Sequence, residues 1–266
     1  MPGRHATAEA LDTLLAHGRL AVSTEEAAQL LHVPPEHVRV RMQPLVRSGR
    51  VFSPARGLWV VIPPEYRTWR VIPGAQFIEP MMAHLGRDYY LGWLSAAEMY
   101  GAAHQRPQVV QVAVDRHLAD RDIERARLRF IERRHLSELP RLRRNVPTGQ
   151  VWVSAPEATA LDLAAEPGHG GGVSNVATVL AELAEENRLR PRRLAEAAEH
   201  FSLAAVRRLG FLLDTIGQAD LADVLHERAE QHRHFPADVL APTSPVAGEV
   251  DARWRLRVNT DVEADL

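Results

Sequence analysis

Three helical patterns followed by an alternating one occupy the first 62 residues, and this order restricts the fold more than any other feature. Apolar residues at helical spacing predict helices over residues 7–17, 23–31 and 35–48. Residues 50–62 alternate around a predicted turn at 53–57, which indicates a β-hairpin of two strands. Pro63 and Pro64 then mark the end of the pattern. A small folding unit of three helices and one hairpin is therefore expected.

Local signals at the helix ends support this interpretation. Ser23 followed by Glu26 is a capping-box pattern, which predicts that the second helix begins directly after Ser23. Pro35 suits the first turn of the third helix, because a proline there gives up no intrahelical hydrogen bond. Pro44 lies inside the same helix and is expected to kink it. The order helix, helix, turn, helix, hairpin is that of a winged helix-turn-helix, predicted to form a DNA-binding domain over residues 1–64.

The third predicted helix has an apolar side and a basic side. Val38, Met42, Leu45 and Val46 share the side expected to face the core. Arginine can bind guanine and glutamine can bind adenine in the major groove, and arginines at the flanks can bind phosphates. The alternative is a solvated helix used for protein contacts. The predicted DNA-binding residues are Glu36, Arg39, Val40, Arg41, Gln43, Arg47, Arg50, Ser53 and Arg56.

The remainder of the chain, after a linker over residues 65–76, mixes both kinds of secondary structure. The predicted class is α+β, with a larger mixed domain over residues 65–266 that ends in a helical bundle. A flexible, Gly-rich break is expected near residues 167–173. Ser154 and Glu157 form a second capping-box pattern. Strands are predicted over 109–114, 128–132, 150–153 and 253–258, and helices over 77–85, 95–100, 154–164, 174–187, 191–200, 203–216 and 219–232.

Positive charge is unevenly distributed along the chain. All 32 basic residues are arginine, which excludes any chemistry that needs a lysine amine. Residues 116–144 contain ten arginines and five acids. A solvated surface around a strand is the simplest interpretation, and a second nucleic-acid contact or an interdomain ion-pair network are the alternatives. The candidates for this secondary basic patch are Arg133, Arg134, Arg141, Arg143 and Arg144.

Composition and motifs argue against catalysis and cofactors. The chain has no cysteine, which excludes disulfides and thiolate metal sites and fits a reducing cytoplasm. No apolar run is long enough to span a membrane, and no export signal is recognised at the start. His226 and Glu227 begin a zinc-protease pattern, but Glu230 stands where its second histidine belongs. We therefore expect a cytoplasmic protein that is not an enzyme and holds no metal or cofactor.

Several motifs resemble those of AbiEi-type antitoxins of type IV toxin–antitoxin systems. Residues 89–101 read YYLGWLSAAEMYG, and residues 105–107 read QRP. The helix start at 154–163, SAPEATALDL, and the segment 208–214, RLGFLLD, resemble two further motifs of that family. Tyr100 stands where the family usually has histidine, so no essential chemistry is expected at this position. With the predicted N-terminal domain, the resemblance covers most of the chain.

The resemblance implies a biological role. Such proteins are autorepressors that bind inverted repeats in double-stranded promoter DNA through their winged helix. Their C-terminal domain counters a nucleotidyltransferase toxin without a stable complex between the two proteins. A monomer in solution that binds cooperatively on DNA is expected. Two alternatives remain open: a ligand-responsive winged-helix transcription factor without a toxin partner, and an enzyme that acts on nucleic acid.

Overall fold

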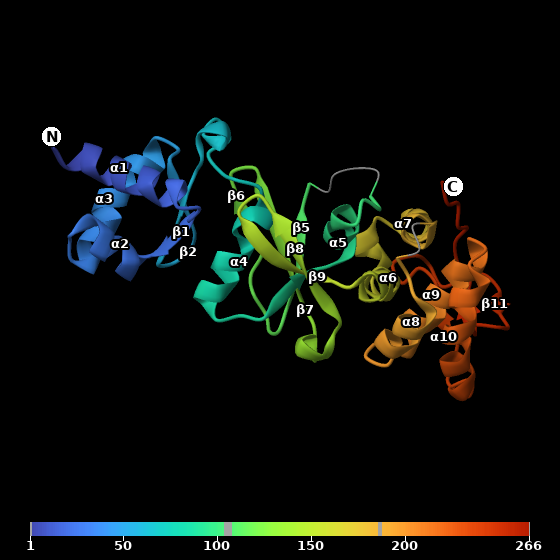
Figure 1. The fold of residues 1–266 in the computed structure, drawn as a ribbon. Helices are drawn as coiled ribbons and strands as arrows, with labels where there is room; N and C mark the ends of the chain where they lie inside the picture. The colour runs from blue at the N-terminus through green and yellow to red at the C-terminus, as the bar shows by residue number, and fades with distance from the viewer. Residues whose placement is uncertain (1, 104–107, 186–187, 266) are drawn as a thin grey trace. The chain divides into compact units, whose positions relative to one another are not determined.

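The structure, a computed structural model, describes residues 2–103, 108–185 and 188–265. The chain divides into two compact units (Figure 1). Unit 1 comprises residues 1–89, 108–133 and 143–152, and unit 2 comprises residues 90–107, 134–142 and 153–266. Helices and sheets are both present, which confirms the predicted mixed class. The predicted domain boundary at residue 64, which would let residues 1–64 fold independently, stays a prediction.

Unit 1 begins with three helices and a small sheet. The helices are α1 (Pro2–Ala16), α2 (Thr24–Leu31) and α3 (Pro35–Arg47), and the strands are β1 (Ala21–Ser23), β2 (Val51–Ala55) and β3 (Leu58–Val61). The three predicted helices are confirmed, with α1 starting earlier than expected. The antiparallel strand order is β1-β3-β2. The predicted two-stranded arrangement was therefore one strand short.

The helix ends follow from local hydrogen bonding. The Ser23 hydroxyl accepts from the Glu26 amide at 3.1 Å, and the Glu26 carboxylate accepts from the Ser23 amide at 2.8 Å. These two bonds complete the predicted capping box of α2. His32 ends the helix in the left-handed conformation, at φ 52°. Pro35 stands in the first turn of α3, as predicted, and Pro44 lies inside that helix.

The hairpin turn is tighter than predicted. Ser53 belongs to β2, and only Arg56 and Gly57 connect the two strands. Gly57 has φ +83°, a conformation that glycine adopts without steric cost. The register shifts between Phe52 and Ala55, so β2 accommodates Pro54 at an irregularity. The expected turn over 53–57 was therefore too long.

The rest of unit 1 is one helix against strands. Helix α4 (Gly74–Leu85) contacts all three strands of the small sheet and β7 (Ala126–Glu132) of a larger one. The ring of Phe77 on α4 lies edge-on to Phe52 of the hairpin, with centroids 5.1 Å apart. A short 3-10 helix, η1 (Pro64–Tyr66), precedes α4. The hairpin is consequently covered on one side by α4.

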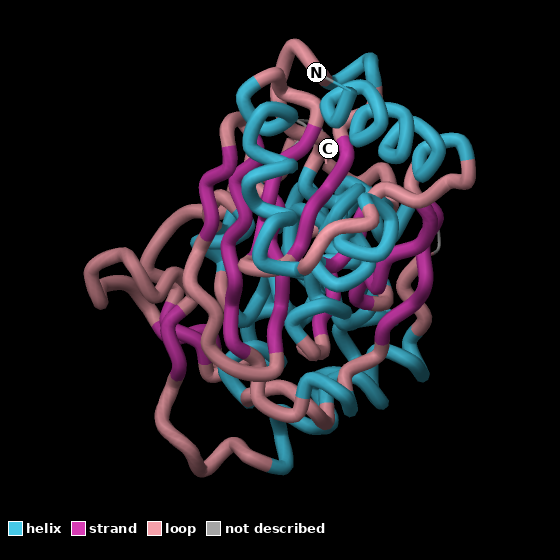
Figure 2. The backbone as a smooth tube through the Cα atoms, turned by 90° about the vertical axis from the view of Figure 1, so that its left-hand side faces the viewer, coloured by secondary structure: helices cyan, strands magenta, loops and turns pink. Residues whose placement is uncertain are grey.

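The larger sheet has six strands in the order β6-β7-β5-β4-β9-β8. Figure 2 draws the strands of the protein in magenta. β5 pairs with β7 in parallel, β6 with β7 antiparallel, and β4 with β9 in parallel. Most of its residues belong to unit 1. Its strands are β4 (Tyr89–Leu91), β5 (Val110–Val114), β6 (Arg121–Ile123), β7 (Ala126–Glu132), β8 (Arg141–Val146) and β9 (Gly149–Ser154).

Unit 2 is mostly helical. Helix α9 lies at its centre and packs against α6, α7 and α10. The four late helices predicted from the sequence are confirmed to within about two residues, although Asn187 lies outside the described residues. The helices are α5 (Trp93–Met99), α6 (Pro156–Ala165), α7 (Val173–Glu185), α8 (Pro191–Ala198), α9 (Leu203–Thr215) and α10 (Ala219–Gln231), with η2 (Leu136–Glu138) and η3 (Pro167–Gly170).

Residues 167–170, where a flexible break is expected, form the 3-10 helix η3, and their flexibility stays a prediction. Two other sequence expectations for unit 2 differ from the structure. The strand predicted over 253–258 is reduced to β12 (Leu256–Arg257), in a small sheet with β10 (Asp238–Val239) and β11 (Val250–Asp251). The second capping box is also absent, because Ala155 caps α6 without a side-chain bond. Among the described helices, none is long and apolar enough to cross a membrane.

Candidate nucleic-acid interface

Helix α3 turns its apolar side inward and its polar side to solvent. Val38, Met42 and Leu45 are buried in a core with α1, α2 and the small sheet, and Val46 is half-buried beside them. Gln43 is half-buried, and the other predicted residues of the helix are exposed: Glu36, Arg39, Val40, Arg41 and Arg47. In the part of the chain that the structure describes, no other segment covers these five side chains. The side of α3 predicted to meet DNA is therefore accessible.

The connection between α2 and α3 is fixed by backbone bonds. The Val33 amide donates to the Ala28 carbonyl at 3.0 Å, and the left-handed His32 reverses the chain between them. The His37 amide donates to the Pro34 carbonyl at 2.9 Å in the first turn of α3. This local bonding holds α3 across α2, and the buried residues of α3 then determine which of its sides faces outward.

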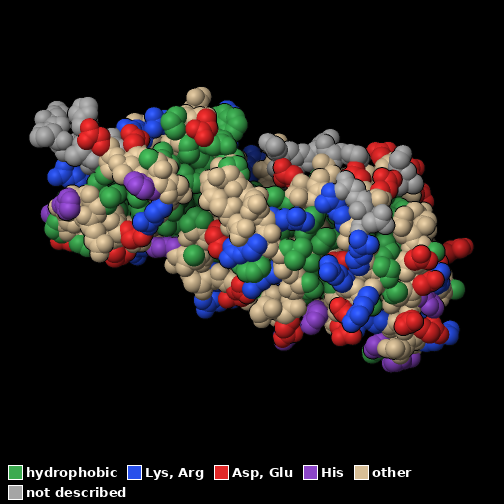
Figure 3. All heavy atoms as spheres, viewed as in Figure 1, with side chains coloured by type: hydrophobic (Ala, Val, Ile, Leu, Met, Phe, Trp, Pro, Cys, Tyr) green, Lys and Arg blue, Asp and Glu red, His purple; other side chains and the backbone are tan. Residues whose placement is uncertain are grey.

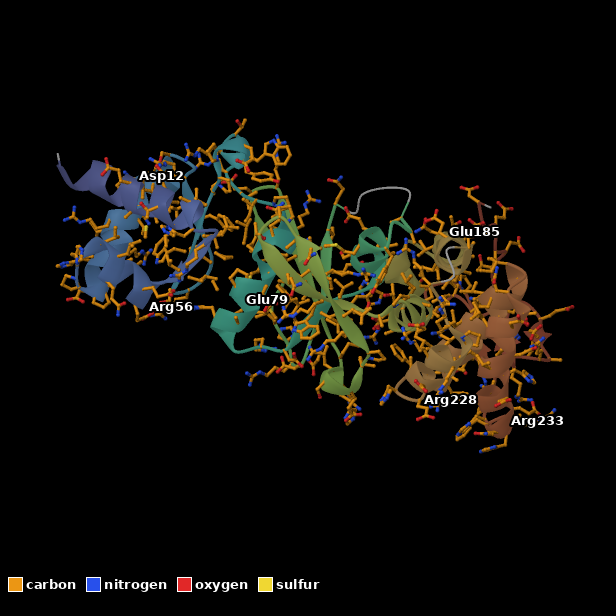
Figure 4. All side chains as sticks on the ribbon, in the orientation of Figure 1. Asp12, Arg56, Glu79, Glu185, Arg228 and Arg233 are labelled. Atoms are coloured by element: carbon orange, nitrogen blue, oxygen red, sulfur yellow. The ribbon has the colours of Figure 1, made fainter. Side chains whose placement is uncertain are left out.

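The hairpin offers fewer exposed groups than the sequence analysis expected. Its strand residues are buried except for Ser53, whose hydroxyl donates to the Ala55 carbonyl at 2.8 Å. Arg56 is exposed at the turn, while its carbonyl bonds to Nε2 of His84 on α4 at 2.9 Å (Figure 4). The Pro54 carbonyl accepts from Arg121. The hairpin is thus anchored to its own unit and presents mainly Arg56.

Arg50 is placed differently from the other predicted residues. Its Nη2 lies 2.8 Å from both carboxylate oxygens of Asp12 on α1. Arg67 lies 3.6 Å from the same carboxylate, so Asp12 stands between two guanidinium groups. The Arg50 side chain is 25% exposed. In the free protein its charge is already balanced by Asp12, labelled in Figure 4.

Two further arginines near α3 were treated as part of a linker in the sequence analysis. Arg70 donates to the Val46 carbonyl at 3.2 Å and so satisfies a carbonyl in the last turn of α3. It also lies 3.5 Å from Glu124. The carbonyl of Arg67 lies beside Gly49, just after the end of α3. In the sequence, the only signal for a role of Arg67 and Arg70 is that both are arginines. Their proximity to α3 depends on the tertiary fold.

Most arginines of the predicted secondary basic patch interact with other residues of the protein. Arg143 lies 2.9 Å from Glu79 and stacks over the Trp152 ring at 4.2 Å from its centroid. Glu79 also accepts from the Tyr89 hydroxyl at 2.6 Å, and burial together with this bond raises the pKa of Tyr89. Arg133, Arg141 and Arg144 each have interaction partners as well, and Arg134 is exposed. The five arginines are divided between the two units.

The family-like motifs of unit 2 form a buried polar centre. The Tyr90 hydroxyl donates to Asp162 at 3.0 Å, and both residues are fully buried. The Tyr100 hydroxyl donates to the Ser154 carbonyl at 2.6 Å, so the residue in place of the usual histidine holds backbone structure. Glu157 accepts from the Arg190 amide at 3.1 Å instead of capping α6. The motif at 105–107 lies outside the described residues.

The third motif explains how α9 holds the end of the chain. Arg208 is almost fully buried and donates to the carbonyls of Ala165 at 3.0 Å and Val239 at 2.7 Å. Burial lowers the pKa of its guanidinium. Gly210 faces the ring of Trp254 so closely that a Cβ atom would overlap the indole. These residues are structural: backbone carbonyls accept the hydrogen bonds of the Arg208 guanidinium, and the charge of Asp238 favours its charged form.

The described residues contain no group of three or more His, Cys, Asp or Glu side chains that could hold a metal ion. The rings of His232 and His234 stack with centroids 6.5 Å apart, and Phe235 lies against both. His226 packs edge-on against Trp254 at 5.5 Å. These three histidines therefore take part in aromatic packing.

The fold and surface define a mixed α/β protein of two units, with an exposed basic helix in the first and a buried motif centre in the second. Residues 90–215 match the family described as the AbiEi antitoxin C-terminal domain. This match confirms the resemblance to AbiEi-type antitoxins that the sequence motifs indicate.

Solved structures share this fold, and one of them comes from Mycobacterium tuberculosis. The crystal structure of the RV2827C protein from Mycobacterium tuberculosis superimposes with a TM-score of 0.66 at 17% sequence identity, covering 92% of this chain and 88% of that chain. At this identity the similarity concerns the fold alone. By sequence, no curated protein matches the chain.

Proposed function

We propose that the protein is a sequence-specific DNA-binding repressor of its own operon and a type IV antitoxin against a nucleotidyltransferase toxin. The exposed side of α3 carries the DNA-binding half of this proposal. Residues 1–62 have the element order of a winged helix-turn-helix, in which the later helix enters the major groove. The AbiEi domain at residues 90–215 supports the antitoxin half.

The chemistry of α3 suits duplex DNA. Arg39 and Gln43 lie about one turn apart on the outward side, where they can reach guanine and adenine edges. Arg41 lies towards the flank of the helix and Arg47 lies at the end of its outward side, and both can bind phosphates. Arg56 contributes a further cation at the hairpin turn. Two copies bound to inverted repeats would place their α3 helices one or more helical turns apart.

A mobility-shift assay tests the DNA-binding half. The full chain should shift a fragment from upstream of its own gene at nanomolar concentration and in the presence of competitor DNA. Replacing Arg39 and Gln43 together by alanine should abolish the specific shift. The loss of two base contacts at about 1–3 kcal/mol each accounts for this result.

The control is a double variant of the same composition on unit 2, Arg192→Ala with Gln231→Ala. Both side chains are exposed, and the Arg192 side chain is 92% exposed. This control should bind like the wild type, and circular dichroism should be unchanged in both variants. Sequence-specific binding by the α3 variant would show that α3 does not read DNA.

Co-expression tests the antitoxin half separately. A nucleotidyltransferase encoded beside this gene should arrest growth when expressed alone, and the full chain should restore growth. The α3 double variant should still restore growth, because we assign protection to the AbiEi domain. Failure of the wild-type chain to protect cells would contradict the proposed antitoxin role without affecting the DNA-binding half.

A further inference from the structure

Val40 is an unusual residue for the exposed middle of a helix. Its relative exposure is 71%, among the highest of the large hydrophobic side chains in the described part of the chain. A β-branched residue is also less favourable in a helix than alanine, leucine or arginine. Neither burial nor helix propensity therefore explains a valine at this position.

The location of Val40 is as informative as its exposure. At 100° per residue, Val40 points directly away from the buried residues Val38, Met42 and Leu45. It occupies the middle of the outward stripe, between Glu36 and Gln43. A helix that enters the major groove brings this central position closest to the base edges. An apolar group stands where the proposed contact is deepest.

The four bases differ in what they offer to such a group. Thymine alone carries a methyl group in the major groove, at C5, and cytosine presents only a C–H at this position. The two methyl groups of valine can bury that methyl group, but they can form no hydrogen bond with a base. We infer that Val40 is a specificity-determining residue that selects a thymine through its C5 methyl group. This inference rests on the proposed DNA-binding function.

The neighbouring side chains are consistent with this assignment. Gln43 lies three residues further along the same stripe and can bind adenine with both groups of its amide. Along the helix, Arg39 precedes Val40 and Arg47 follows Gln43, and both arginines can bind guanine or phosphate. The expected half-site therefore contains a thymine beneath Val40, with an adenine or a guanine at a neighbouring base pair.

Replacement of thymine by deoxyuridine tests the inference, because it removes only the methyl group. Binding sites are first selected from a random duplex pool with the full chain. Each thymine of the selected site is then replaced singly by deoxyuridine, and the dissociation constant is measured. Wild-type protein should lose about fourfold in affinity at one thymine in each half-site, the factor expected for one buried methyl group.

Two variants assign the effect to Val40. Val40→Ala should bind the thymine and deoxyuridine sites equally, because the smaller side chain no longer reaches the methyl group. Alanine is an excellent helix former, so the fold should be retained. Val246→Ala is the matched control: Val246 is 73% exposed, and this variant should discriminate like the wild type.

The outcomes separate this inference from the function on which it rests. Equal affinity of the wild-type protein for every singly substituted site would refute the role of Val40 while leaving sequence-specific binding intact. Unchanged discrimination by Val40→Ala would refute it too. A pool that yields no preferred sequence would overturn the proposed DNA-binding function and this inference together.

Discussion

In unit 2, a few individual residues determine how α9 packs against the C-terminal segment. Trp254 is buried, donates its indole N–H to Asp214 at 2.7 Å and lies against Gly210 of α9. Glycine normally weakens a helix by roughly 1 kcal/mol relative to alanine. Its presence in the middle of α9 is explained by the indole, which occupies the space that a side chain would need. Helix α9 and the C-terminal segment are thereby held in close contact.

Gly210→Ala should destabilise unit 2 by about 1–3 kcal/mol or more, despite the better helix propensity of alanine. The added methyl group would overlap the Trp254 ring and force α9 and the C-terminal segment apart. Urea denaturation followed by circular dichroism measures this effect. Gly168→Ala is the matched control, because a Cβ atom at Gly168 meets nothing within 4 Å. Equal stability of the two variants would disprove the proposed packing role.

Among the elements, helices were predictable and several strands were not. Helices α2, α3, α8, α9 and α10 show clear apolar periodicity and end signals in the sequence, and their bounds agree closely. β1 has only three residues and exists through pairing with β3. β8 has the sequence RLRRNV, which lacks apolar alternation. β1 depends on a partner that is distant in sequence, and β8, an edge strand beside β9, has no alternation to identify it, so a local pattern reveals neither.

The two predicted capping boxes also show that a local sequence pattern does not determine which partners its side chains bind. In the predicted box at Ser23, the Glu26 carboxylate bonds to Arg19 and still accepts from the Ser23 amide, so both bonds of the box form. In the second pattern, the Ser154 hydroxyl bonds to Thr159 at 2.7 Å, and Glu157 accepts from the Arg190 amide at 3.1 Å. A side chain within α6 and a residue distant in sequence have therefore replaced the partners that the local cap would need. The outward side of α3 was predictable, whereas the pairing of Arg50 with Asp12 was not.

The cap of α2 should make the stability of unit 1 depend on pH. The Ser23 amide bond, followed by the bond and charge of Arg19, lowers the pKa of Glu26 below its ordinary value of 4.5. A lowered folded-state pKa stabilises the fold above the unfolded value and loses this contribution as the pH falls through the folded one. The free energy of unfolding should therefore fall more steeply from about pH 5 to about pH 3 in the wild type than in Glu26→Gln.

Urea denaturation at each pH measures these slopes. Glu25→Gln is the control, because it removes an exposed carboxylate of the same turn that lies outside the capping box. This variant should keep the steeper slope of the wild type. Identical slopes for the wild type and Glu26→Gln would contradict the role assigned to the cap.

For the whole molecule, the distribution of charge matters more than its net value of −2. On the face in Figure 3, acidic and basic side chains are interspersed over the C-terminal helices. Around α3, by contrast, exposed arginines outnumber exposed acids. The exposed arginines of the predicted interface are Arg39, Arg41, Arg47 and Arg56. Arg50 is excluded from this set because Asp12 balances it.

This count predicts the salt dependence of DNA binding. Because Arg39 is assigned to a base, three neutralised phosphates give a slope of about −2.7 for log K against log salt concentration. Asp12→Asn should raise the affinity and steepen the slope to about −3.6, because it releases Arg50 for a fourth phosphate. Titrations at several NaCl concentrations measure both quantities. Asp220→Asn, an exposed acid on α10, should behave as wild type, and an unchanged slope in Asp12→Asn would mean that Arg50 does not reach DNA.

The attachment of the hairpin to α4 limits how much sequence one copy can distinguish. An arm held by Phe77 and His84 cannot swing out to follow a groove, so each copy offers little more than one helix to the bases. A recognition sequence of only a few base pairs occurs by chance at many places in any genome. A repressor built in this way must obtain its selectivity from two adjacent half-sites occupied together, and a lone half-site should leave transcription almost unaffected.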